Sequence, residues 1–168
     1  MANYTTIEIQ SLAILTLFLL YFIVKLRRFF KQFTSKSLLK RNRTLKKLKR
    51  LSWETFEHLT MELFRNKGWH VTGNTKKGAD GGVDIWLQKK SLTQKNISAI
   101  VQCKRYENAR VTIKVIREMY GLMHEYGVDE VYIVTTSRFT KECNTFIKDK
   151  NITLIDGEQL VKQIATYA

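Results

Sequence analysis

The chain has 168 residues, of which 44% are hydrophobic, and its 29 Lys and Arg against 15 Asp and Glu give a formal net charge of +14. This length suits one globular domain with an appendage, while two cysteines and three scattered histidines exclude a disulfide framework and give little support for a His/Cys metal site. Most of the positive charge lies in residues 25–50, so the folded part by itself does not have the composition of a general nucleic-acid binder.

Residues 9–24 form an apolar run without a charge, which predicts a membrane helix within an N-terminal transmembrane segment, residues 1–25. The run is slightly short for a bilayer core of about 30 Å, but its flanking residues can extend it. A cleaved signal peptide fits less well, because the positive charge follows the run, and a buried core helix remains open. The basic cluster after the run predicts a single-pass inner (cytoplasmic) membrane protein, with the following domain facing the cytoplasm.

Residues 26–50 contain many Lys and Arg and no acidic residue, which indicates a basic juxtamembrane linker. Leu26, Phe29, Phe30 and Phe33 have helical spacing, so this part can lie on a membrane with its cations over anionic head groups. We therefore expect residues 9–50 to contact membrane lipids. Binding to nucleic acid is the second interpretation, because polybasic segments bind phosphates of either kind.

The predicted domain, residues 51–168, opens with a helix from an N-cap at Ser52 to about Lys67. Trp53, Phe56, Leu59, Leu63 and Phe64 form its apolar stripe, and the carboxylate of Glu57 lies beside this stripe. A short strand is expected at 69–73, followed by a polar loop at 74–82. Lys76 and Lys77 in this loop either contact phosphates or are simply solvated.

Two predicted strands carry polar side chains at positions where apolar ones are expected. Gly81 and Gly82 precede the strand 83–87, which has Asp84 near its start, and the glycine pair suits a tight turn or a close approach of backbone to a ligand. In the strand 100–104, Gln102 and Lys104 share one face and Cys103 lies on the other. Burying such groups is costly unless they are paired or bind a metal, so an ion pair between Asp84 and Lys104 is the structural alternative to a catalytic site.

The remaining pattern alternates helices and strands. A helix is expected at 111–126, ended by Gly127, with its stripe of Val115, Ile116, Met119, Tyr120 and Met123 in the core. A strand at 130–135, a helix at 139–150, a strand at 152–155 and a helix at 157–167 follow. This alternation predicts an α/β domain with a mixed sheet covered on both faces.

The order Gly-Gly-Val-Asp, a hairpin-length interval and then Gln-Cys-Lys-Arg-Tyr resembles the Mrr-like catalytic domain of the PD-(D/E)xK restriction endonuclease superfamily. The resemblance covers most of residues 51–168 and implies a restriction-endonuclease-like three-layer fold with a central mixed sheet (αβββαβ core). It places Asp84, Gln102 and Lys104 in the catalytic motif, with Gln102 in the position of the usual acid. It also implies a role in metal binding for Glu57, whose alternative is a solvated helix carboxylate.

From this resemblance we expect a metal-dependent endodeoxyribonuclease that hydrolyses DNA phosphodiester bonds. Mg²⁺, with Mn²⁺ as a substitute, would be bound by Asp84, Gln102 and Glu57, while Lys104 would orient or deprotonate a water or stabilise charge on the phosphate. Arg105 and Tyr106 either contact the substrate backbone or cap the end of the sheet. A homodimer would explain double-strand cuts, although nothing in the sequence shows one.

Two other functional classes fit the same residues. One is a catalytically inactive, membrane-bound module that binds or tethers nucleic acid, and the other is a structural membrane protein that retains an ion-pair network. Salt-sensitive binding of nucleic acid distinguishes the first from the second.

Overall fold

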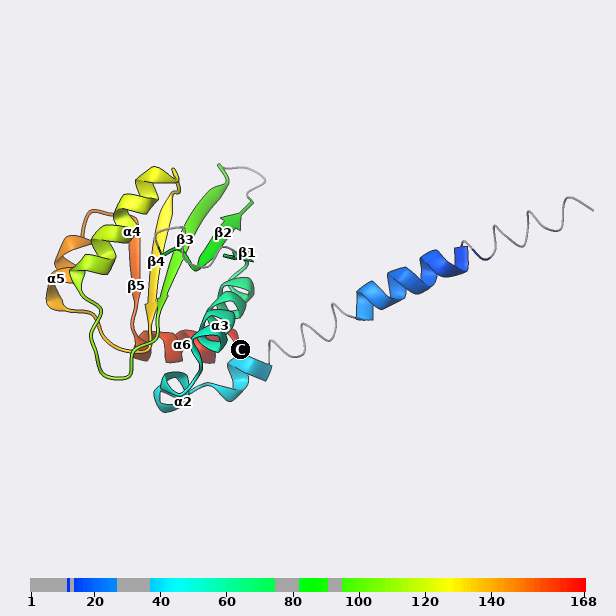
Figure 1. Cartoon of the computed structure of the whole chain (residues 1–168), viewed down its shortest axis with the longest axis horizontal. Helices are drawn as coiled ribbons and strands as arrows, with labels where there is room; N and C mark the ends of the chain where they lie inside the picture. Colours follow the sequence, from blue (N-terminus) through cyan, green and yellow to red (C-terminus); the bar gives the residue numbers. More distant parts are fainter. Residues whose placement is uncertain (1–11, 13, 27–36, 75–81, 91–94) are drawn as a thin grey trace, which may run out of the picture. The chain divides into compact units, whose positions relative to one another are not determined.

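The computed structural model describes residues 12, 14–26, 37–74, 82–90 and 95–168. These residues belong to two compact units, Met1–Ser37 and Leu38–Ala168. The second unit contains the β-sheet and its covering helices (Figure 1).

In the first unit, residues 14–26 are helical and their large apolar side chains are exposed. None of the helices among the described residues is long and apolar enough to cross a bilayer. The predicted transmembrane segment is therefore not supported. Residues 1–11 and 13 of that segment lie outside the described residues.

The second unit contains five strands in a single mixed sheet, in the order β1-β2-β3-β4-β5. The strands β1 to β3 pair antiparallel, and β3 to β5 pair parallel. The mixed sheet and the order of elements confirm the prediction. The strands are β1 (His70–Gly73), β2 (Ile85–Lys89), β3 (Ile97–Lys104), β4 (Glu130–Thr135) and β5 (Ile152–Ile155).

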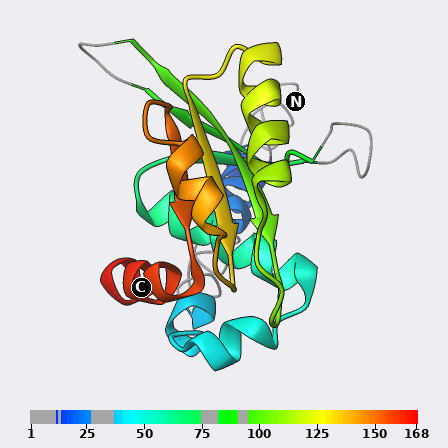
Figure 2. The same ribbon diagram turned by 90° about the vertical axis from the view of Figure 1, so that its left-hand side faces the viewer.

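Helices cover both faces of the sheet, as the sequence predicts, and each face has its own apolar core (Figure 1). One core joins the sheet to α3 and α6, and the other joins it to α4 and α5. Figure 2 shows α4 to the right of the strands and α6 to their left. The labelled helices are α2 (Leu45–Lys49), α3 (Trp53–Asn66), α4 (Ile113–Glu125), α5 (Lys141–Phe146) and α6 (Gly157–Tyr167).

The helix α3 begins and packs nearly as predicted. The Ser52 hydroxyl accepts a hydrogen bond from the Thr55 N–H, and the buried stripe runs along one face of the helix. Trp53 differs from the prediction, because its side chain is 46% exposed. It is the first residue of the helix and lies before the turn at which the stripe enters the core. The helix α5 is also shorter than the predicted 139–150, because residues 147–149 form a turn.

The second unit begins thirteen residues before the predicted boundary at Leu51. Residues 37–41 and α2 are helical, and Leu39 and Leu48 are fully buried against α3 and α6. This basic stretch therefore packs on the domain from Leu38 onward, instead of serving as a linker throughout. Its cations stay at the surface while its leucines enter the core, which is the usual arrangement of an amphipathic segment.

Candidate active site

Asp84 lies immediately before β2, and the neighbouring strand fixes its position. Its backbone N–H donates to the carbonyl of Val101 at 3.0 Å. Its Oδ2 accepts one hydrogen bond from the Cys103 N–H at 2.6 Å and another from Gln102 Nε2 at 2.5 Å. The carboxylate is thus held against the end of β3 by one backbone donor and one side-chain donor.

Gln102 is nearly buried, with only 3% of its surface exposed. While Nε2 bonds Asp84, the amide oxygen lies against Gly82, where an added Cβ would come within 2.5 Å of it. Gly82 also has a φ of 105°, which side chains rarely allow. Gly82 therefore lies in a turn, one of the two predicted roles, and it gives room to the Gln102 side chain; the predicted approach to a ligand stays a prediction. Gly81 lies outside the described residues.

Glu57 reaches the same place from the helix α3. Burial raises the pKa of Asp84, and this effect outweighs the opposing effects of the Cys103 N–H, the Gln102 amide, the Lys104 charge and a hydrogen bond with the Glu57 side chain. The two carboxyl groups are therefore within hydrogen-bonding reach. The structure brings together all four residues that the resemblance selected.

Lys104 is the last residue of β3, and its backbone is tied to the next strand. Thr135 is its partner in the parallel ladder, and the Thr135 hydroxyl donates to the Lys104 carbonyl at 2.6 Å. No ion pair joins Lys104 to Asp84 within the described part of the chain, although its charge lowers the pKa of that carboxyl. Lys104 is partly buried, and its ammonium does not form the ion pair with Asp84 that was the structural alternative.

Cys103 is fully buried in the core that contains α3, on the opposite side of β3 from the side chains of Gln102 and Lys104. Burial, reinforced by the nearby Asp84 charge, raises the pKa of its thiol well above the usual value. The thiol therefore stays protonated and is no nucleophile. Its contribution to the site is the backbone N–H that binds Asp84. The sequence did not reveal this donor, because every residue except proline supplies a backbone N–H.

The donor set suits a hard divalent cation in chemistry, although it is small. The described residues contain no group of three or more His, Cys, Asp or Glu that could hold a metal ion. Glu57 and Asp84 provide carboxylate oxygens, and Gln102 provides an amide oxygen, which are the ligand types that Mg²⁺ prefers. The residues present therefore fit a metal that also takes ligands from water and substrate.

The predicted nucleic-acid contacts are only partly described. Lys76 and Lys77 lie in residues 75–81, outside the described residues. The Arg105 guanidinium donates to the Lys49 carbonyl at 2.9 Å and lies 3.7 Å from Glu107, so it joins the end of β3 to α2.

Tyr106 bonds through its backbone to the neighbouring loop and packs its ring on the core beneath α4 and α5. Its N–H donates to the Thr136 hydroxyl oxygen at 3.0 Å, and its carbonyl accepts from the same hydroxyl at 2.7 Å. Arg105 and Tyr106 thus hold the end of the sheet, which was the alternative role considered for them.

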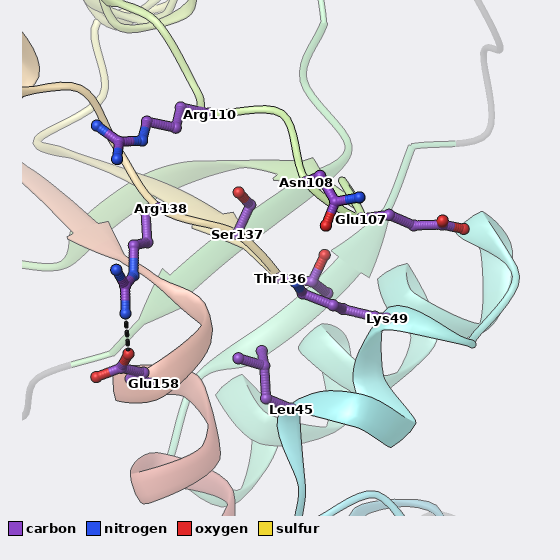
Figure 3. A pocket seen from close by; sticks show the side chains of 9 residues that line it. All are labelled: Leu45, Lys49, Glu107, Asn108, Arg110, Thr136, Ser137, Arg138 and Glu158. Atoms are coloured by element: carbon purple, nitrogen blue, oxygen red, sulfur yellow. Dashed lines mark hydrogen bonds and ion pairs between the residues drawn. The ribbon is translucent and has the colours of Figure 1, made fainter.

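A pocket of about 280 Å³ lies beyond the ends of β3 and β4 (Figure 3). Four segments form its walls: α2, the loop from β3 to α4, the loop from β4 to α5, and the start of α6. Sequence reasoning did not identify it, because its residues come from segments far apart in the chain. It is lined by Leu45, Lys49, Glu107, Asn108, Arg110, Thr136, Ser137, Arg138 and Glu158.

Comparisons with known proteins agree with this fold. The family Mrr_cat, described as restriction endonuclease, matches residues 48–164. A DNA modification-dependent restriction endonuclease, AspBHI, has a similar structure with a TM-score of 0.60 at 16% identity, covering 79% of this chain and 35% of its own. The protein of unknown function AF1548 is similar with a TM-score of 0.52 at 15% identity, covering 65% of each chain. No curated protein matches the sequence.

The structural likeness shows a shared fold, and this chain spans only about a third of the length of AspBHI. The family match covers well over half of the chain and includes α3, all five strands and most of α6. It also includes Glu57, Asp84, Gln102 and Lys104. The chain therefore belongs to the restriction endonuclease family, in its Mrr-type catalytic domain.

Proposed function

We propose that this protein is a metal-dependent endodeoxyribonuclease that hydrolyses phosphodiester bonds in DNA. The observation that carries the proposal is the convergence of Glu57, Asp84, Gln102 and Lys104 at the junction of α3, β2 and β3. Membership of the restriction endonuclease family supports the same reaction class.

In this proposal, the chain supplies a pre-organised cradle for a divalent cation. Asp84, Glu57 and the amide oxygen of Gln102 would hold the cation, which would screen the phosphate charge and lower the pKa of a bound water. The Cys103 N–H and the Gln102 amide fix the Asp84 carboxylate before substrate arrives. Because this carboxylate need not reorganise, its charge is available where the reaction occurs.

Lys104 would act on the phosphate itself. Its ammonium donates hydrogen bonds to the phosphoryl oxygens and stabilises the negative charge that accumulates as water attacks phosphorus and the P–O bond to the leaving strand breaks. The backbone bond from Thr135 fixes the end of β3, so the stem of Lys104 begins from a rigid point. A lysine suits this role, because its flexible stem lets one charge follow the moving oxygen.

The test is cleavage of supercoiled plasmid and branched DNA by the full chain in a mild non-ionic detergent, with Mg²⁺ or Mn²⁺ and with EDTA. Asp84→Ala and Lys104→Ala should each lower metal-dependent nicking by roughly a hundredfold or more. Lys148→Ala is the matched control, because Lys148 is exposed and precedes β5 at the opposite end of the parallel strands. Equal activity of all three variants would refute the assigned site.

The alternative is an inactive module that binds or tethers nucleic acid. One observation favours it, namely that the described residues offer only two carboxylates to a metal and that the Gln102 amide already bonds one of them. This alternative predicts salt-sensitive DNA binding without metal-dependent cleavage. The same plasmid assay, combined with a binding titration, therefore separates the two functions.

We also propose that the N-terminal unit attaches the protein to the cytoplasmic membrane. Support comes from the uncharged run 9–24, from the exposed apolar side chains on residues 14–26, and from the cations that follow. Membrane fractionation tests this, using the full chain beside a variant with Leu15, Phe18 and Phe22 replaced by Ser. Equal recovery of both proteins in the fraction without membranes would refute attachment through this segment.

A further inference from the structure

We propose that the pocket beyond β3 and β4 binds a backbone phosphate of the DNA strand close to the phosphate that is cut. This inference rests on the proposed function, because it assigns a second contact to the same substrate. It concerns Lys49, Asn108 and Arg110, none of which the family resemblance selected. Figure 3 shows the Arg110 and Arg138 side chains on one side of the pocket and the Lys49 side chain, from α2, on the other.

The pocket is the direct continuation of the catalytic strand. Lys104 and Thr135 are partners in the parallel ladder, and the lining residue Thr136 follows Thr135 in the chain. Neighbouring strands lie about 4.8 Å apart and successive residues about 3.3 Å apart, so the pocket begins roughly 10 Å or less from the backbone of Lys104. Successive phosphates of one strand advance about 3.4 Å along a duplex. A strand cut at the site therefore has phosphates within reach of the pocket.

The cations of the pocket differ in whether they already have a partner. The Arg138 guanidinium bonds the Glu158 carboxylate at 2.7 Å, and this ion pair lowers the pKa of Glu158. The side chains of Lys49, Asn108 and Arg110, in contrast, have no polar partner within the described part of the chain. One ammonium, one guanidinium and one amide thus offer donors to a single cavity.

The walls that carry these donors are fixed by contacts within the fold. A Cβ on Gly157 would lie 2.5 Å from Leu45 Cδ1 and 2.7 Å from the Thr136 carbonyl, so α2, α6 and the loop after β4 are in tight contact. The bond from Arg105 to the Lys49 carbonyl locks the end of α2, and the Ser137 hydroxyl bonds the Ala109 carbonyl. The donors therefore lie on a pre-formed scaffold, which reduces the entropy lost on binding.

The chemistry of the pocket suits one phosphate of a longer strand. Its volume of about 280 Å³ admits a phosphate with part of its sugar, and every lining residue except Leu45 is of a polar or charged type. Glu107 and Glu158 line it as well, and they repel a ligand with several closely spaced negative charges. A diester phosphate carries a single charge and fits these limits, because Arg110 can bind its oxygens in a bidentate manner while Lys49 adds a point charge.

The first experiment measures the salt dependence of DNA binding by the full chain in EDTA, which prevents metal-dependent cleavage. Lys49→Ala combined with Arg110→Ala should weaken binding of a short duplex about tenfold and lower the slope of log Kd against log salt by about one. The control combines Lys90→Ala with Lys148→Ala, which removes two exposed positive charges at the opposite end of the parallel strands and should leave the slope unchanged. A double variant with the control's affinity and slope would overturn the proposal.

The second experiment locates the phosphate with duplexes in which single phosphates are replaced by neutral methylphosphonates. One position near the cut should weaken binding of the unaltered protein about tenfold and have no further effect on Arg110→Ala. Equal losses in both proteins at every position would overturn the pocket assignment, even if the protein cleaves DNA. A position-specific loss without any cleavage by the unaltered protein would support the pocket as a DNA contact and refute the nuclease. No binding by the unaltered protein would refute both.

Discussion

Replacement of Gln102 by Glu tests the electrostatics of the proposed metal cradle. It places a carboxylate where the native protein has an amide, with almost no change in size. In the native protein, Gln102 Nε2 donates to Asp84 Oδ2 at 2.5 Å. The variant replaces this donor with an acceptor oxygen, so two carboxylates with Glu57 nearby would occupy a partly buried site.

The geometry sets the size of the effect. Two unit negative charges about 3 Å apart repel by roughly 5 kcal/mol at an effective dielectric constant of 20. The pair avoids part of this cost by keeping a proton, so the folded protein binds that proton more tightly than the unfolded chain does. Stability of the metal-free variant is therefore highest in acid and falls by up to about 1.4 kcal/mol per pH unit above about pH 4.3, until the proton is lost.

The assay is thermal unfolding of the variant and the native protein at several values between pH 5 and pH 8, with EDTA or with Mg²⁺. We expect the variant to lose far more stability than the native protein across this range in EDTA. Mg²⁺ should restore the stability, because a third carboxylate strengthens cation binding and a ligand that binds only the folded state stabilises it. Gln88→Glu, an exposed change of the same kind in β2, is the control.

Either of two results would contradict this prediction. If Gln102→Glu follows the pH dependence of Gln88→Glu in EDTA, the side chain of residue 102 does not face Asp84 as described. If the pH dependence appears but Mg²⁺ gives no recovery, the carboxylates are adjacent yet do not form a metal site.

Three further predictions concern the same unit of the protein. Asp84→Asn should abolish metal-dependent cleavage and yet gain stability over the native protein as pH rises from below the ordinary carboxyl pKa, because burial raises the pKa of the native carboxyl and makes its ionisation costly; a stability gap that is equal at about pH 3 and about pH 7 would contradict this. Gly82→Ala should lower cleavage tenfold or more by displacing Gln102, whereas Gly121→Ala, with open space at its Cβ, should leave cleavage unchanged. Leu48→Ala should cost about 3 kcal/mol in urea unfolding, because the side chain is fully buried, while the exposed Lys47→Ala should cost less than about 0.5 kcal/mol; equal costs would place α2 outside the domain core.

The sequence alone determined the local structure of the domain to a large extent. Alternating polarity placed Gln102 and Lys104 on one face of a strand with Cys103 on the other, because side chains alternate along any strand. The apolar stripe of α3, the cap at Ser52 and the glycines that end α3 and α4 are also local features. Each of these features depends on residues within a few positions of one another, so it can be predicted from the sequence alone.

The convergence of Glu57 with Asp84 could not be worked out from periodicity. A carboxylate beside an apolar stripe occurs on most surface helices, and only the resemblance to a nuclease family singled this one out. The packing of α3 against the sheet then brings it to Asp84. Likewise, the Cys103 N–H binds Asp84 because the two strand ends are in register, which a sequence does not specify.

Only the tertiary structure decided where the domain begins and what surrounds the end of β3. Residues 38–50 are so basic that their composition predicts a surface linker. Leu39 and Leu48 nevertheless lie in the core against α3 and α6. Burial of an apolar side chain depends on a complementary surface, and here that surface belongs to segments distant in the chain. For the same reason the pocket that joins α2, two loops and α6 exists only once the sheet has assembled.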